Sequence, residues 1–220
     1  MHQSANYLAE VTMSDSAFPD NYFQRPDNSD DGLFYIAPRK VVHIDDGAIN
    51  ALREQFAVLL PPSGVYLDLM SSWRSHLPDS LKPTRVIGLG MNSEEMKDNP
   101  QLSRHIVHNL NDDPLLPFED AAFDAAFCTV SVQYLTHPVE VFGEVSRVLK
   151  PGAPFVVSFS NRCFPTKAVA IWQSTSDLQH LALVTRYFED AGNWNNVTAW
   201  QKRSASSDPL YIVWAKKTAI

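Results

Sequence analysis

Apolar and polar positions alternate along this chain in blocks that predict strands and helices in turn. Short, nearly continuous apolar runs predict buried strands at residues 65–69, 85–89, 105–108, 123–129 and 153–159. Apolar residues spaced three and four apart predict amphipathic helices at residues 46–60, 138–149 and 178–190. Buried strands separated by amphipathic helices are typical of a parallel sheet covered on both faces. The pattern therefore predicts an α/β fold.

The last part of the chain breaks this alternation. Two strand patterns, at residues 196–201 and 210–215, follow one another with a polar loop and no helix between them. Neighbouring strands without an intervening helix predict an antiparallel hairpin, which we expect at the edge of the sheet.

The first 40 residues or so are rich in Asp, Asn, Ser and Pro and lack a clear period. We therefore divide the chain into an N-terminal arm or cap, residues 1–45, and a main domain, residues 46–220. The first dozen residues are expected to be disordered. The arm carries Phe34, Tyr35, Arg39 and His43, so we expect it to cover the mouth of a ligand site, and deletion of residues 1–30 to leave the fold intact.

Composition narrows the class of partner. The chain has 220 residues, of which 45% are hydrophobic and 20% charged, and this is ordinary for a globular protein. Its net charge is −7 and its 18 Lys and Arg residues are scattered, which argues against a nucleic-acid partner. No signal peptide or membrane-spanning run is visible, and two cysteines are too few for a disulfide framework. We expect a cytoplasmic protein that binds a small molecule, with no membrane partner; its oligomeric state stays open.

Ligands of open parallel sheets bind at the carboxyl ends of the strands. The segments that follow the first four predicted strands are therefore the candidate site: residues 68–74, 90–93, 109–113 and 129–134.

Several short sequence motifs resemble those of a known protein family. Leu116-Pro-Phe118, Phe123-Asp124 and Arg147-Val-Leu-Lys-Pro-Gly152, in this order, resemble class I S-adenosylmethionine-dependent methyltransferases of the small-molecule, type 11-like kind. The likeness extends over about residues 40–170 and implies a Rossmann-like methyltransferase fold with S-adenosylmethionine as its cofactor. The residues that would hold this cofactor are Asp68, Met70, Ser71, Ser72, Gly90, Met91, Asn109, Leu110, Asn111, Thr129, Val130 and Tyr134.

The cofactor segments depart from the family pattern at two places. Met70, Ser71 and Ser72 stand where the family has glycines, so its glycine-rich loop is degenerate here. The two serines either begin a helix or contact the cofactor. Gly90 stands where the family has the acid that binds the ribose, and Asn109 replaces an acid near the adenine. If the missing acid alone limits affinity, Gly90→Asp should tighten cofactor binding.

No nucleophile or metal centre is evident, and we predict no metal. His43, Tyr134 and Arg162 are the candidates for a catalytic role, because each is expected near the mouth of the site. His43 is followed by two carboxylates, which either assist it as a base or cap the next helix; we favour the cap. Trp73 is expected in the core. Two functions stay open: methyl transfer to a small-molecule acceptor, or binding of S-adenosylmethionine, S-adenosylhomocysteine or another small ligand without catalysis.

Overall fold

The computed structural model describes residues 18–219. The expected disorder of the first dozen residues lies outside this range. The described chain forms one mixed sheet with the strand order β3-β2-β1-β4-β5-β7-β6. The strands are β1 Val65–Leu69, β2 Arg85–Gly90, β3 Arg104–Val107, β4 Ala125–Thr129, β5 Pro154–Phe159, β6 Trp194–Ser204 and β7 Ser207–Lys217.

The first five strands run parallel, and β7 pairs antiparallel with both β5 and β6. The predicted terminal hairpin is therefore confirmed, with β6 at the edge and β7 inserted next to β5. Both hairpin strands are longer than their patterns predicted. Phe123, the predicted start of β4, makes an isolated bridge to Leu149 instead.

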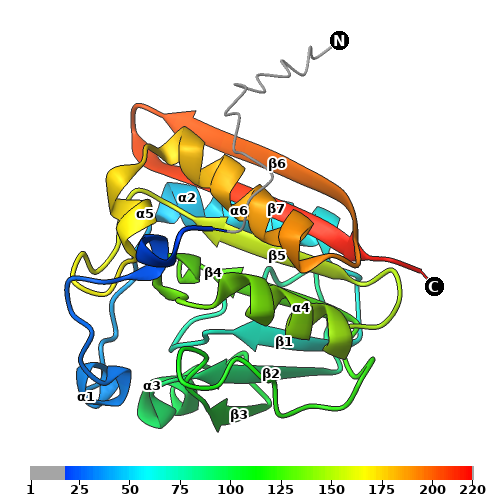
Figure 1. Cartoon of the computed structure of the whole chain (residues 1–220). Coiled ribbons are helices and arrows are strands. Elements are labelled where there is room, and N and C mark those ends of the chain that lie inside the picture. Colours follow the sequence, from blue (N-terminus) through cyan, green and yellow to red (C-terminus); the bar gives the residue numbers. More distant parts are fainter. Residues whose placement is uncertain (1–17, 220) are drawn as a thin grey trace.

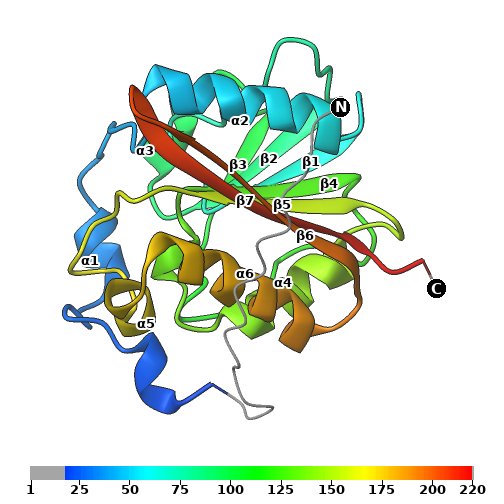
Figure 2. The same cartoon turned by 90° about the horizontal axis from the view of Figure 1, so that it is seen from above.

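Helices cover both faces of the sheet (Figure 2). The helix α2, Asp46–Leu59, lies on one face, and α4, Pro138–Val148, and α6, Asp177–Ala191, lie on the other. The remaining helical segments are short: η1 Asp20–Phe23, α1 Asp31–Tyr35, α3 Ser93–Lys97, η2 Val132–Tyr134 and α5 Ala170–Ser174. The predicted α/β fold, mainly parallel and covered on both faces, is confirmed.

Local sequence explains where the long helices begin and end. The side chain of Asp45 accepts a hydrogen bond from the Ala48 amide and so caps α2. Pro138 occupies the first turn of α4, where a missing amide proton costs nothing. A capping box of Ser176 and Gln179 begins α6.

The two faces bury separate apolar clusters. Beneath α4 and α6, Phe142 packs with Phe155 and Phe188, with ring centroids 5.1 and 4.7 Å apart. Beneath α2, the second cluster includes Leu77 and Leu81, which come from the connection between β1 and β2. This connection, residues 70–84, contains no helix. Its two leucines therefore fill space that a crossover helix would cover in an ordinary parallel unit.

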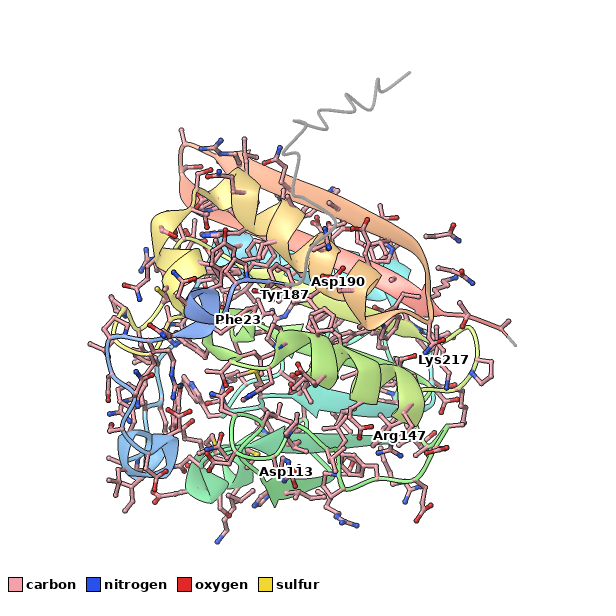
Figure 3. The ribbon with its side chains drawn as sticks, in the orientation of Figure 1. Phe23, Asp113, Arg147, Tyr187, Asp190 and Lys217 are labelled. Atoms are coloured by element: carbon pink, nitrogen blue, oxygen red, sulfur yellow. The ribbon has the colours of Figure 1, made fainter. Side chains whose placement is uncertain are left out.

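The described part of the arm packs on the main domain. The Phe23 ring of η1 lies 6.1 Å from that of Tyr187 on α6, and both are labelled in Figure 3. Main-chain hydrogen bonds join Ala170 to Gln24, at 2.8 Å, and Asp27 to Thr166, at 2.9 Å. The division of the chain at residue 45 stays a prediction.

Candidate functional site

A cavity lies at the carboxyl ends of β1, β2 and β4. It holds about 1120 Å³ of empty space, its open mouth included. The arm and α1 lie at the end of the sheet toward which β1 and β2 point (Figure 1), and arm residues from Asp31 to His43 form part of the cavity wall. Each residue predicted to hold the cofactor lines this cavity: Asp68, Met70, Ser71, Ser72, Gly90, Met91, Asn109, Leu110, Asn111, Thr129, Val130 and Tyr134.

The segment Met70–His76, which we call the serine loop, leaves β1 as irregular chain held by side-chain hydrogen bonds. Asp68 Oδ2 accepts from the hydroxyls of Ser71, at 2.8 Å, and Ser75, at 2.5 Å. Asn99 Nδ2 donates to the Ser72 carbonyl and to Ser75 Oγ, both at 2.9 Å. The alternative that Ser71 and Ser72 begin a helix is wrong, because no helix follows them. Their hydroxyls fix the loop instead.

Met70 keeps the backbone shape that a glycine would give. Its φ is +56°, in the left-handed region that favours glycine. After the neighbouring strand β4, Val130 has φ +47°, which is rarer still for a β-branched side chain. Left-handed backbone of this kind costs about 1–2 kcal/mol per residue. Both residues line the cavity, so the strain is stored in the wall of the candidate site.

Gly90 is a glycine because the serine loop passes directly over it. The Ser71 amide donates to the Leu89 carbonyl at 2.8 Å, which carries the loop along the end of β2. A Cβ atom on Gly90 would lie 2.2 Å from the Ser71 carbonyl oxygen. No side chain fits there without moving the backbone. The expectation that Gly90→Asp would tighten binding assumed that a carboxylate fits at this position. That assumption is wrong, because the Ser71 carbonyl occupies the space.

Asp68 is a buried carboxylate, 3% exposed. Its Oδ1 has no hydrogen-bond partner among the described residues. Burial raises the pKa of this carboxyl to about 7, and the bonds from Ser75 and Ser71 offset part of the rise. A positively charged group at this wall would favour the ionised form.

The side chains of the two asparagines after β3 are engaged in hydrogen bonds within the protein. Asn109 bridges its own turn, with Nδ2 donating to Asp112 at 2.8 Å and Oδ1 accepting from the Asn111 amide at 3.1 Å. Asn111 Nδ2 donates to Asp31 Oδ2, at 2.9 Å, and to the Tyr134 carbonyl, at 3.0 Å. Asn111 thus joins the arm to the wall of the cavity.

The candidate catalytic residues fall into two groups. His43 and Tyr134 both line the cavity, and each packs against Phe164. Burial lowers the pKa of His43, with a smaller effect from Arg162, so the imidazole is neutral near pH 7. Arg162 does not line the cavity: its side chain is 59% exposed and pairs with Asp208 at 2.8 Å. The expectation for Arg162 is wrong, because Asp208 on β7 draws its guanidinium away from the mouth.

The carboxylate of Asp45, two residues after His43, bonds α2 and β7 instead of the imidazole. Asp45 accepts hydrogen bonds from the Ala48 amide, at 2.9 Å, and from Ser207 Oγ and the Asp208 amide, both at 2.8 Å. The favoured reading of Asp45 as a cap is confirmed, and the His43 ring has no hydrogen-bond partner among the described residues.

Trp73 is not a core residue. It is half-buried at the cavity wall, and its Nε1 donates to the Val41 carbonyl of the arm at 2.9 Å. The Arg74 guanidinium stacks 3.9 Å from its ring centroid. Trp73 and Val41 both line the cavity, so this hydrogen bond holds the arm against the cavity wall.

A buried ion network holds the arm in place. The Lys167 side chain is 0% exposed, and its amine lies 3.0 Å from Asp31 Oδ1 and 3.2 Å from Asp27 Oδ2. Arg25 pairs with the other oxygen of Asp31 at 2.8 Å. Because removing one partner of a buried network leaves a charge uncompensated, this network is costly to break. Residues 25–31 thus pack firmly on the main domain, and the expectation that deletion of residues 1–30 leaves the fold intact stays a prediction.

A second set of bonds joins the arm to the segment after β2. Asn92 caps α3 and its Nδ2 donates to the Tyr35 carbonyl at 2.8 Å. Glu95 Oε1 accepts from the Arg39 amide at 2.5 Å, and Oε2 accepts from Ser72 Oγ at 2.6 Å. Sequence reasoning missed Glu95. The N-cap spacing of Asn92 and Glu95 was the available signal.

Residues 75–157 match the family model described as a methyltransferase domain. The solved structure of a methyltransferase bound to the Trm112 activator of Haloferax volcanii covers 76% of this chain and 88% of its own, with a TM-score of 0.58 and 16% identity. YcgJ of Bacillus subtilis covers 80% and 100%, with a TM-score of 0.56 and 11% identity. The chain has the class I methyltransferase fold.

Curated relatives agree over shorter stretches. The bifunctional biotin biosynthesis protein BioHC of Teredinibacter turnerae is 26% identical over 60% of this chain. The sterol 4-C-methyltransferase strm-1 of Caenorhabditis elegans is 45% identical over 19% of it. The matches span 21% and 13% of the relatives' own lengths. The predicted resemblance to class I methyltransferases is confirmed, and the family indicates S-adenosylmethionine as the cofactor.

The chemistry of the cavity suits a positively charged ligand such as S-adenosylmethionine. Asp68 and Glu95 are 3% and 6% exposed, and neither has a basic partner within 4.0 Å among residues 18–219. Buried carboxylates without a counter-ion favour a ligand that supplies positive charge. S-adenosylmethionine carries a sulfonium and an ammonium. The residues present therefore fit it, although the family's glycines and ribose acid are absent.

Among residues 18–219, no group of three or more His, Cys, Asp or Glu side chains is placed to hold a metal ion. None of the described helices has the length and apolar character needed to cross a membrane.

Proposed function

We propose that this protein transfers the methyl group of S-adenosylmethionine to a small-molecule acceptor. The observation that carries the proposal is that two buried carboxylates without a basic partner, Asp68 and Glu95, line the cavity of a methyltransferase fold. When bound, the cofactor supplies an electrophilic methyl group on a cationic sulfur. Because transfer is an in-line displacement, the main task of the protein is to position two reactants in the cavity.

Each part of the cavity has a separate task in this proposal. Asp68 receives the cofactor's ammonium, because its Oδ1 is unpaired. The arm excludes water and lines the part of the cavity that would hold the methyl acceptor. In this part the rings of His43 and Tyr134 pack against Phe164. A neutral His43 can take the acceptor's proton as the new bond forms. Tyr134 is a weaker base candidate, since burial raises the pKa of its hydroxyl to about 12.

Calorimetric titration with S-adenosylmethionine and S-adenosylhomocysteine, each alone, tests the binding half of this proposal. Both should bind, because they share the ammonium and the adenosine. The first should bind more tightly, since it adds a positive sulfur near the carboxylates. If neither ligand bound at millimolar concentration, the proposed function would be wrong.

One observation favours a second function, in which the protein binds the ligand without catalysis. His43 lacks a hydrogen-bonded partner to orient it, because Asp45 is committed to α2 and to β7. Incubating the protein with methyl-labelled cofactor and a fractionated pool of small metabolites separates the two functions. Label that moves to a small product, and moves more slowly with His43→Ala at unchanged affinity, supports transfer. Cofactor that stays bound and unreacted supports the binding function.

A further inference from the structure

A nucleoside ligand of this cavity needs an acceptor for its ribose hydroxyls, and the usual place for one is closed. The Ser71 carbonyl lies where a side chain of residue 90 would begin. Asn92, the next polar side chain, is committed to the Tyr35 carbonyl and the Glu95 amide, at 2.8 and 2.9 Å. The ribose carboxylate must therefore come from elsewhere or be absent.

Glu95 is a carboxylate in the right part of the wall. It belongs to α3, which follows β2 directly, and it lines the cavity although only 6% of it is exposed. Each of its oxygens accepts one hydrogen bond, from the Arg39 amide and from Ser72 Oγ. An ionised carboxylate has about four acceptor positions, so about two remain free. Two adjacent hydroxyls of one ribose would fill them.

The surroundings of Glu95 hold it for such a role. Its position at the N-terminal turn of α3 is fixed by the cap from Asn92. Its two carboxylate oxygens accept hydrogen bonds from two different segments, Ser72 of the serine loop and Arg39 of the arm. No basic side chain among the described residues pairs with it. A buried carboxylate held by two donors, without a counter-ion, is a costly arrangement unless further donors arrive.

We propose that Glu95 is the ribose-binding residue of this cavity and accepts hydrogen bonds from both hydroxyls of a nucleoside cis-diol. The proposal rests on the proposed function for the identity of the nucleoside ligand. In this chain α3 supplies the carboxylate, and the Ser71 carbonyl of the serine loop lies where a side chain at position 90 would begin. Because Glu95 also holds the Arg39 amide, the ribose subsite and the arm share one residue. A ribose that carries a phosphate on either hydroxyl is excluded by charge repulsion.

The test compares two ligands that differ in the diol alone, adenosine and 2′,3′-dideoxyadenosine. Affinities are measured by calorimetry, or by displacement of S-adenosylmethionine where binding is weak. Wild-type protein should bind adenosine at least about tenfold more tightly, because charge-assisted hydrogen bonds are lost with the dideoxy ligand. Glu95→Gln should reduce this preference to below about threefold. The exposed neighbour Glu94 supplies the matched control, since Glu94→Gln removes the same charge and should keep the full preference.

The ligand pair keeps the result interpretable if Glu95→Gln also loosens the arm. A looser arm weakens both ligands alike and leaves their ratio unchanged, whereas loss of diol contacts changes the ratio. Glu95→Asp, which keeps the charge on a shorter stem, should retain part of the preference, and thermal melting checks that each variant is folded. Wild-type protein that binds S-adenosylmethionine but does not distinguish the two nucleosides would overturn this proposal alone. Protein that binds none of these ligands would overturn the proposed function as well.

Discussion

The connections in the two halves of the parallel sheet are held by different kinds of contact. In β4–α4–β5, a helix connects neighbouring strands, and Phe142 packs among aromatic rings beneath it. In β1–β2, irregular chain takes the place of a helix, and the serine loop is held by hydrogen bonds that it donates to Asp68 and Glu95 and accepts from Asn99. Apolar packing thus fixes the connection between β4 and β5, whereas polar bonds fix the serine loop and Leu77 and Leu81 anchor the rest of its connection. The cavity wall after β1 therefore depends on polar contacts that lie apart from the apolar packing of β4–α4–β5.

The largest expected effect lies in the packed half. Phe142→Ala should destabilise the protein by about 3–5 kcal/mol, because it leaves a cavity among three rings that cannot close around it. Leu77→Ala, in the irregular connection, should cost less, about 2–3 kcal/mol, since a chain without a helix can settle into the space. Urea unfolding measures both. Equal losses would mean that the connection is as rigid as α4.

Gly90→Ala tests the closeness of the serine loop to β2. The added methyl group would lie 2.2 Å from the Ser71 carbonyl, so the loop must shift. We expect a loss of about 1–3 kcal/mol in stability and a marked loss of cofactor affinity. Gly143→Ala is the control: it lies in α4 with no atom within 4 Å of the added carbon, and it should stabilise slightly. Tighter binding by Gly90→Ala would contradict the assigned geometry.

Asp68→Asn separates binding from stability within the polar half. The amide oxygen can still accept from Ser71 and Ser75, so the loop should stay in place. The lost charge should weaken the binding of S-adenosylmethionine by about 1–3 kcal/mol, or about fivefold to 150-fold. Thermal melting without ligand should change much less. A destabilised protein with unchanged affinity would show that Asp68 serves the loop alone.

The smallest effect is a dependence of affinity on pH. Because burial raises the pKa of Asp68 to about 7, this residue is mostly protonated at pH 6 and mostly ionised at pH 8. Affinity for the cationic ligand should rise over this interval by no more than about tenfold. Stability without ligand should move the other way: a raised folded-state pKa gives stability at low pH that is lost as the pH rises through about 7. Asp68→Asn should flatten both curves, and an unchanged pH profile in this variant would assign the effect to another group.

The sequence predicted the packed half better than the polar half, for a physical reason. Apolar periodicity reports burial directly, and so it located each strand of the sheet and the helices α2, α4 and α6. The strand ends then indicated the lining of the cavity. The details of that lining depend on contacts between distant residues. The contact between Gly90 and Ser71, the pairing of Arg162 with Asp208, and the link from Glu95 to Arg39 have no local pattern.

The lysine network implies an order of events during synthesis. The arm is made first, yet its anchor, Lys167, follows Asp27 by 140 positions. The chain must therefore extend past β5 before the arm can settle, and β7 must then enter between β5 and β6 to complete the sheet. Contacts so distant in sequence form late, because closing long loops is entropically costly. Until Lys167 leaves the ribosome, the cavity of the nascent protein lacks its arm wall, and Asp27 and Asp31 lack their lysine partner.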